Sequence, residues 1–130
     1  MLILAFETSA KAASVALSDG AKLLGENYQN TGLTHSQTLL PMAQELLKSC
    51  GKTPEQVEAV AVAAGPGSFT GIRIGVSASK GLAFAVAKPA IGVSTLASIS
   101  QQRRGHRSAL RRREWCIPPM RRLGLHRTKV

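Results

Sequence analysis

The chain has 130 residues and a formal net charge of +10, from 17 Lys and Arg against 7 Asp and Glu. With 44% hydrophobic and 18% charged residues it is too apolar to be disordered, yet no apolar run reaches the ~20 residues that a membrane-spanning helix needs. The N-terminus lacks the basic segment and cleavage site of a signal peptide, and Cys50 and Cys116 lack the spacing of a disulfide framework or a zinc site. We therefore expect a soluble, cytoplasmic protein with reduced thiols.

The charge is unevenly distributed along the chain. Residues 1–100 carry 7 basic and 6 acidic groups, whereas residues 101–130 carry 10 basic groups and 1 acidic group. Hydrophobic residues number 48 in the first segment and 9 in the second. We expect residues 1–100 to form one domain and residues 101–130 to be a basic tail, either disordered or translated out of frame.

Five segments have the length and composition of strands: Met1–Glu7, Ala12–Ser18, Lys22–Tyr28, Ala59–Ala64 and Ala90–Val93. The first is a continuous apolar run, which is typical of a strand buried on both faces. Asp19-Gly20 predicts a tight two-residue turn, so the second and third strands should form a hairpin.

Helices are predicted at four places: residues 35–50, one or two turns that begin at residue 54 after the cap Thr53, about 72–87 and about 95–100. Thr34 and Gln37 fit a capping box at the start of the first helix, and Gly51 suits a left-handed C-cap at its end. Pro89 blocks continuation of the long helix, and Ser94 can cap the last one.

This order predicts the fold class. Three consecutive strands followed by alternating helices and strands are typical of an α/β, ribonuclease-H-like lobe. We expect a mixed five-stranded sheet with flanking helices, in which the last two strands run parallel to the first. The Arg-rich tail should be irregular.

The loop over residues 65–71 contains three glycines and precedes the long helix. Backbone N–H groups at a helix N-terminus attract anions, but the spacing matches neither the Walker pattern nor GxGxxG, and Ser68 or Thr70 can equally cap the helix. A structural turn and weak binding of a nucleotide or other anion both remain open. The candidate contacts lie in this loop and at the end of the first strand: Glu7, Thr8, Ser9, Gly65, Gly67 and Ser68.

The long helix is rich in small residues. Ser77, Gly81 and Ala85 recur every four residues and form a stripe that lets another helix approach closely. The stripe fits either a tight contact within the lobe or a surface for a partner protein.

No catalytic residue, metal ligand or required cofactor is predicted. Glu7 has no partner carboxylate, Asp19 belongs to a turn, and His35 lies in the first turn of a helix. His106 and His126 have no acidic or thiol neighbours at ligand spacing. These residues form neither a nucleophile–base–acid set nor a metal site.

Several motifs in residues 1–100 resemble the TsaB family, also called YeaZ. They are Leu4-Ala-Phe-Glu-Thr-Ser9, Thr34-His-Ser-Gln37, Gly65-Pro-Gly-Ser-Phe-Thr-Gly-Ile-Arg-Ile-Gly75, Gly81-Leu-Ala-Phe84 and Ile91-Gly-Val-Ser-Thr-Leu96. The resemblance implies an actin-like, sugar-kinase-like fold of two ribonuclease-H-like lobes, of which only the first is matched.

The resemblance also implies a function. TsaB-like proteins are non-catalytic partners of the catalytic subunit TsaD, and with the ATPase TsaE they support transfer of a threonylcarbamoyl group to a tRNA adenosine. Contact with tRNA would be indirect, and a homodimer is another possible pairing. The family's dimer surface uses the two long helices, which implies contacts by Ser77, Ala78, Gly81, Ala85, Leu39 and Ala43.

The catalytic relatives bind a metal through His-x-x-x-His directly after the fifth strand. The resemblance puts Thr95 and Ile99 at those two positions, and isoleucine cannot coordinate a metal. This substitution disfavours a metal-dependent, glycoprotease-like hydrolase.

The last thirty residues have no counterpart in the family motifs. Their 9 Arg against 1 Lys suggest GC-rich DNA read in a wrong frame, which would leave a truncated lobe of impaired function. Alternatively, the tail is an Arg-rich arm that binds RNA phosphates, and the chain is a small RNA-binding protein.

Overall fold

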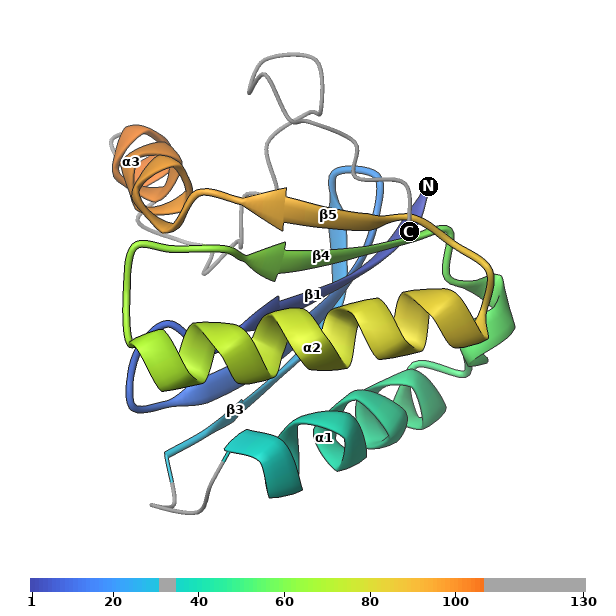
Figure 1. The fold of residues 1–130 in the computed structure, drawn as a ribbon. Helices are drawn as coiled ribbons and strands as arrows, with labels where there is room; N and C mark the ends of the chain where they lie inside the picture. The colour runs from blue at the N-terminus through green and yellow to red at the C-terminus, as the bar shows by residue number, and fades with distance from the viewer. Residues whose placement is uncertain (31–34, 107–130) are drawn as a thin grey trace.

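The computed structural model describes residues 1–30 and 35–106, with side chains as far as residue 100. The elements of the described part, in chain order, are β1 (Leu2–Glu7), β2 (Ala13–Asp19), β3 (Lys22–Gln29), α1 (His35–Ser49), η1 (Pro54–Gln56), β4 (Ala59–Ala63), α2 (Phe69–Ala85), β5 (Ala90–Val93) and α3 (Thr95–His106). Figure 1 shows that α1 and α2 lie side by side on one face of the sheet.

The sheet has the order β3-β2-β1-β4-β5. β1 pairs antiparallel with β2 and parallel with β4, and β4 pairs parallel with β5. This arrangement confirms the predicted mixed sheet of a ribonuclease-H-like lobe. The antiparallel hairpin places β1 at the centre, and the crossover through α2 places β5 beyond β4.

The hairpin turn lies one residue later than predicted. Asp19 is still part of β2 and pairs with Lys22, so the two turn residues are Gly20 and Ala21. Gly20 has a φ of +60°, which a residue without a side chain adopts at no steric cost. The glycine therefore takes the first central position, and the aspartate is left to contact the Met1 amino group at 3.1 Å.

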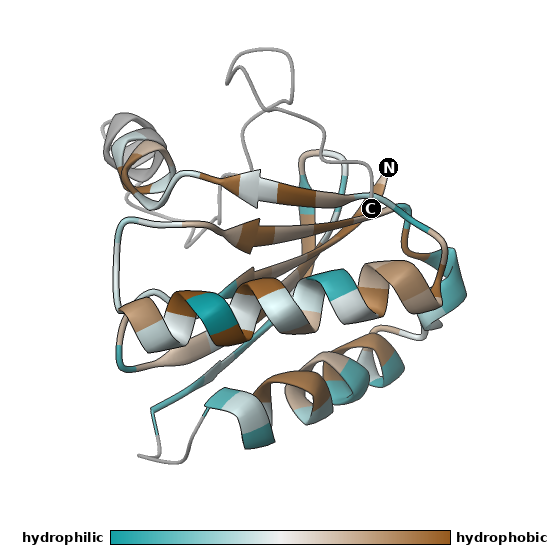
Figure 2. Ribbon diagram, viewed as in Figure 1, coloured by the Kyte–Doolittle hydropathy of each residue, from teal (hydrophilic) through white to brown (hydrophobic). Residues whose placement is uncertain are grey.

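The main core lies between the sheet and the two helices. The alternation of side chains along β1 places Leu2, Leu4 and Phe6 on this face, while Ile3 belongs to a smaller cluster on the other face. Figure 2 shows hydrophobic residues along β4 and mainly hydrophilic ones along the edge strand β3. The largest fully buried core side chains are Leu4, Val15, Leu17, Leu39, Met42, Val57 and Val60.

The two long helices end in the same hydrogen-bonded motif. At the end of α1, Gly51 has a φ of +66° and Lys52 donates its N–H to Leu47 O at 2.9 Å, which confirms the predicted left-handed cap. At the end of α2, Ala87 takes the equivalent position with a φ of +53°, and Lys88 donates to Ala83 O at 2.8 Å. α2 therefore ends before the predicted residue 87.

The left-handed position that ends α1 is a glycine, whereas the one that ends α2 is Ala87, and this difference predicts the effect of replacing Ala87 by glycine. Ala87→Gly removes the side chain from a left-handed residue, so we expect it to raise the free energy of unfolding by about 1 kcal/mol. Urea denaturation of the two purified chains measures the change. Gly51→Ala is the mirror control and should lower stability by a similar amount; equal stability of Ala87→Gly and wild type would contradict the prediction.

The predicted ends of α1 and α3 can be compared with the structure only in part. The proposed cap Thr34 lies outside the described residues. Ser94 accepts a hydrogen bond from Ala97 N at 3.4 Å, as expected of the cap of α3, but α3 continues to His106, beyond the predicted end near residue 100. No helix in residues 1–30 or 35–106 is long and apolar enough to cross a membrane.

Candidate partner-binding groove

The inner face of α2 is a stripe of small, buried residues. Gly71, Gly75, Ser79 and Ala83 are all buried and recur every four residues along the helix. A Cβ at position 71 would lie 2.1 Å from Thr8 O, and one at position 75 would lie 2.2 Å from Thr8 Oγ1. The absence of side chains at the two glycines thus allows α2 to sit directly on the end of β1.

The residues predicted to contact an anion come together at the carboxyl ends of β1 and β4. Their polar groups bond to one another: Ser68 N donates to Ser9 O at 2.7 Å, and Ser9 N donates to Glu7 Oε1 at 2.7 Å. Ser68 Oγ also accepts the N–H of Gly71 at 3.3 Å and caps α2. These bonds hold the loop in its conformation, as expected of a structural turn. Binding of a nucleotide or other anion stays a prediction.

The two glycines at the start of this loop have separate roles. A Cβ at Gly67 would lie 2.6 Å from the Cβ of Ser9, so the loop can close on β1 only with glycine there. Gly65 has a φ of +114°, and its carbonyl accepts the N–H of Thr95 at 2.8 Å. This bond ties the loop to the first residue of α3.

The outer face of α2 carries the stripe singled out in the sequence. Ser77, Gly81 and Ala85 are exposed, and a Cβ at Gly81 would have nothing within 4 Å. Phe84, beside this stripe, is 77% exposed. The alternative of a tight contact within the lobe is therefore wrong for the predicted stripe; that contact is made by Gly71, Gly75, Ser79 and Ala83 on the inner face instead.

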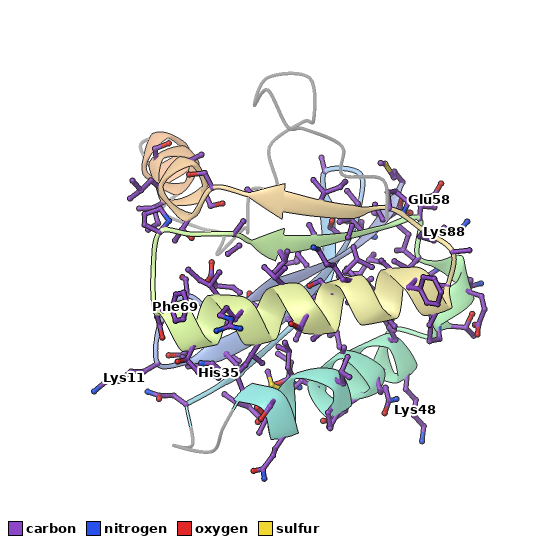
Figure 3. The ribbon with its side chains drawn as sticks, in the orientation of Figure 1. Lys11, His35, Lys48, Glu58, Phe69 and Lys88 are labelled. Atoms are coloured by element: carbon purple, nitrogen blue, oxygen red, sulfur yellow. The ribbon has the colours of Figure 1, made fainter. Side chains whose placement is uncertain are left out.

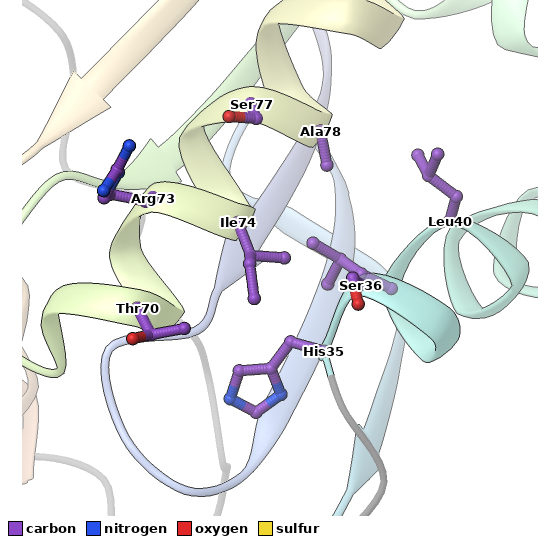
Figure 4. A pocket seen from close by; sticks show the side chains of 9 residues that line it. His35, Ser36, Leu40, Thr70, Arg73, Ile74, Ser77 and Ala78 are labelled. Atoms are coloured by element: carbon purple, nitrogen blue, oxygen red, sulfur yellow. The ribbon is translucent and has the colours of Figure 1, made fainter.

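A groove of about 580 Å³ separates the outer parts of α1 and α2. Its lining mixes apolar and polar side chains and comprises His35, Ser36, Leu39, Leu40, Thr70, Arg73, Ile74, Ser77 and Ala78. In Figure 4, Ile74 and His35 point into the space between the helices, whereas Arg73 points away from α1. Leu40 is 41% exposed, so the groove offers apolar surface to a partner.

Two polar contacts fix the end of the groove where α1 and α2 begin. His35 Nε2 lies 3.1 Å from Ala10 O and acts as the donor, because a carbonyl only accepts. The guanidinium of Arg73 lies 5.1 Å from the centre of the Phe69 ring, a cation–π arrangement. Figure 3 shows His35, Phe69 and Lys11 at the same end of the molecule.

The structure corrects two of the predicted partner contacts. Leu39 touches the groove only at its floor; it and Ala43 are 1% and 2% exposed and belong to the core. The sequence stripe of α1 identified the buried face of that helix, and the buried face cannot also be the contact surface. Leu40 and Ile74, which line the groove, went unnoticed; Leu40 follows Leu39 on the adjacent, outward side of the helix.

The two positions implied as metal ligands lie in the first half of α3. Thr95 is 8% exposed and its Oγ1 has no hydrogen-bond partner in the described part of the chain, while Ile99 is 45% exposed. Within residues 1–30 and 35–106, no group of three His, Cys, Asp or Glu side chains is placed to hold a metal ion. The side chains at these two positions do not supply the imidazoles of the catalytic relatives.

A five-stranded ribonuclease-H-like lobe with a small-residue helix on its surface defines the general class of this protein. The structure of T. thermophilus RuvC in complex with a Holliday junction substrate superposes on it with a TM-score of 0.52 over 77% of this chain and 68% of that one, at 13% sequence identity. At this identity the likeness concerns the fold alone.

More specific comparisons identify the family. Residues 27–111 match the family model of TsaD, tRNA N6-adenosine threonylcarbamoyltransferase. The TsaB protein of Escherichia coli, a "tRNA threonylcarbamoyladenosine biosynthesis protein", is 42% identical over 102 residues, which cover 78% of this chain and 43% of that protein. The structure of YeaZ from Pseudomonas aeruginosa has a TM-score of 0.73 and 40% identity, covering 82% of this chain and 49% of that chain.

The chain belongs to the TsaB/YeaZ family, within the wider group that the TsaD model describes. It spans less than half the length of the curated TsaB relatives that it matches. The family match reaches residue 111, beyond the boundary at residue 100 expected from composition.

Proposed function

We infer that this chain is a non-catalytic scaffold in tRNA N6-threonylcarbamoyladenosine modification, and that it pairs with a TsaD-like catalytic subunit. The observation that carries the proposal is the exposed face of α2 beside the groove, on a lobe of the TsaB family. A TsaE-like ATPase would join through the complex, and tRNA would be contacted by the assembly rather than by this lobe.

The shape of the surface supports a protein partner. Ser77 and Ala85 have small side chains and Gly81 has none, so little protrudes from the outer face of α2. A partner helix can therefore approach closely and gain van der Waals contacts along its length. Phe84 and Leu40 are exposed apolar side chains on either side of these small residues. A surface of small residues between larger apolar ones suits the packing of a partner helix, and it offers a small ligand few contacts.

The chemistry of the candidate residues supports a non-catalytic role. Glu7 accepts the backbone N–H of Ser9, and His35 donates to a backbone carbonyl. The side chains at positions 95 and 99 cannot replace a pair of histidines as metal ligands. Glu7 and His35 are therefore engaged in holding the fold, and positions 95 and 99 carry side chains of the wrong type for a pair of metal ligands.

The alternatives from the sequence have less support. RNA binding rests on residues 101–130, whose side chains lie outside the described residues, and it stays a prediction together with the reading-frame hypothesis. A second copy of the chain could occupy the same surface, because a close-packing helix face can be self-complementary.

Titration of the purified chain with the TsaD-like catalytic subunit of the same organism, followed by isothermal calorimetry, tests the proposal. We expect a one-to-one complex with a dissociation constant in the micromolar range or below. Sedimentation of the chain alone distinguishes self-association. Absence of binding to the catalytic subunit at tens of micromolar would overturn the proposal.

A further inference from the structure

One short loop contacts both helices of the groove. The β1–β2 loop, residues 8–12, reaches α2 through Thr8 and reaches α1 through Ala10, whose carbonyl accepts the hydrogen bond of His35. A Cβ at Gly71 would also lie 3.5 Å from His35 Cδ2. The first turns of α1 and α2 and the end of β1 therefore meet at one place.

Thr8 makes the closest of these contacts. It is fully buried, at 0% exposure, and its hydroxyl donates to Gly71 O at 2.7 Å. Thr8 occupies a notch in α2: its side chain takes the place of a Cβ at Gly75, and its carbonyl oxygen takes the place of a Cβ at Gly71. A side chain held by a hydrogen bond inside such a notch resists both sliding and rotation of the helix.

The same turns of α2 present residues to the groove. Thr70 and Ile74 line the groove next to Gly71 and Gly75 in the chain, and Ser77 and Ala78 follow in the next turn. Since a helix moves as a rigid unit over such a length, a shift at the notch would move the groove-lining residues with it. The notch thus sets the position of one wall of the groove.

We propose that Thr8 is a positioning residue for partner binding: it holds the first turns of α2 in the register that shapes the groove. This inference rests on the proposed function for its biological meaning. It has a clean test, because a side chain with no exposed surface cannot touch a partner. Any effect of changing it on affinity must therefore be indirect, through the position of the helices that line the groove, and hydrogen exchange shows whether α2 is the one that moves.

The test compares Thr8→Val, which keeps the shape and loses the hydroxyl, with Thr8→Ser, which keeps the hydroxyl. We expect Thr8→Val to weaken binding of the catalytic subunit roughly three- to tenfold, the range expected for loss of one buried hydrogen bond. Thr8→Ser should recover most of the wild-type affinity. Both chains are assayed well below their melting temperatures, so that global unfolding does not contribute.

Amide hydrogen exchange of the free chains gives a readout that needs no partner. We expect Thr8→Val to speed exchange in residues 69–78 while residues 59–63 of β4 keep their wild-type rates. Wild-type affinity and exchange in Thr8→Val would overturn the proposal, as would failure of Thr8→Ser to restore them. If the wild-type chain itself does not bind the catalytic subunit, the proposed function fails, and the exchange pattern alone decides whether Thr8 positions α2.

Discussion

Replacement of Gly71 by alanine is expected to destabilise the fold by about 3 kcal/mol or more, although alanine is the better helix former. The new Cβ would lie 2.1 Å from Thr8 O, a backbone atom that no side-chain rotation can remove. To relieve this contact, α2 must lift from the end of β1, which would also break the hydrogen bond from Thr8 to Gly71. Urea denaturation followed by circular dichroism measures the loss.

Gly81→Ala is the matched control on the same helix. Nothing lies within 4 Å of a Cβ at this position, so the substitution should raise stability by up to about 1 kcal/mol through helix propensity alone. The two glycines would thus respond to the same change with opposite signs. Equal effects at both positions would mean that the contact with Thr8 does not determine the position of α2.

Much of the fold could be predicted from local patterns. Continuous apolar runs identified β1 and β4 because both faces of the central strands are buried. Glycine at position 51 identified the end of α1, since the left-handed cap requires a positive φ. Where a non-glycine took the same conformation, at Ala87, the sequence carried no such signal and the predicted helix was too long.

The surface was harder to predict than the fold. A stripe of small residues is the same signal whether it packs against a sheet or faces solvent, and α2 carries both kinds. Gly75 and Ser77 differ by two residues, or about 200° around the helix axis, so the two stripes must point in opposite directions. The spacing alone indicates that there are two faces, but only the contacts of Gly71 and Gly75 with Thr8 show which is the inner one.

The same limit explains the mistaken partner contacts on α1. The periodic apolar residues of an amphipathic helix mark the side that packs in the core, and Leu39 and Ala43 belong to it. A partner surface consists of the residues next to that stripe. Leu40, exposed at the groove, is one of them.

Gly81→Leu is expected to weaken binding to the TsaD-like catalytic subunit by roughly a hundredfold, equivalent to about 2.7 kcal/mol. The proposed partner helix packs closely on the outer stripe of α2, and a leucine there would hold the two helices apart over several residues. The fold should be unaffected because the position has no neighbours within 4 Å. Isothermal calorimetry measures the affinity, and a thermal melt of the free chain verifies the fold.

Two comparisons make this result specific. Lys22→Leu adds a similar apolar side chain to the exposed start of the edge strand β3 and should leave the affinity unchanged. Gly81→Ala adds only one carbon, so its affinity should lie between those of wild type and Gly81→Leu. Wild-type affinity in Gly81→Leu would exclude the outer stripe as the contact surface. If Gly81→Leu instead abolishes self-association and leaves binding to the catalytic subunit intact, the stripe is a homodimer surface, since a bulky residue at a close helix contact disrupts only the complex in which that contact is made.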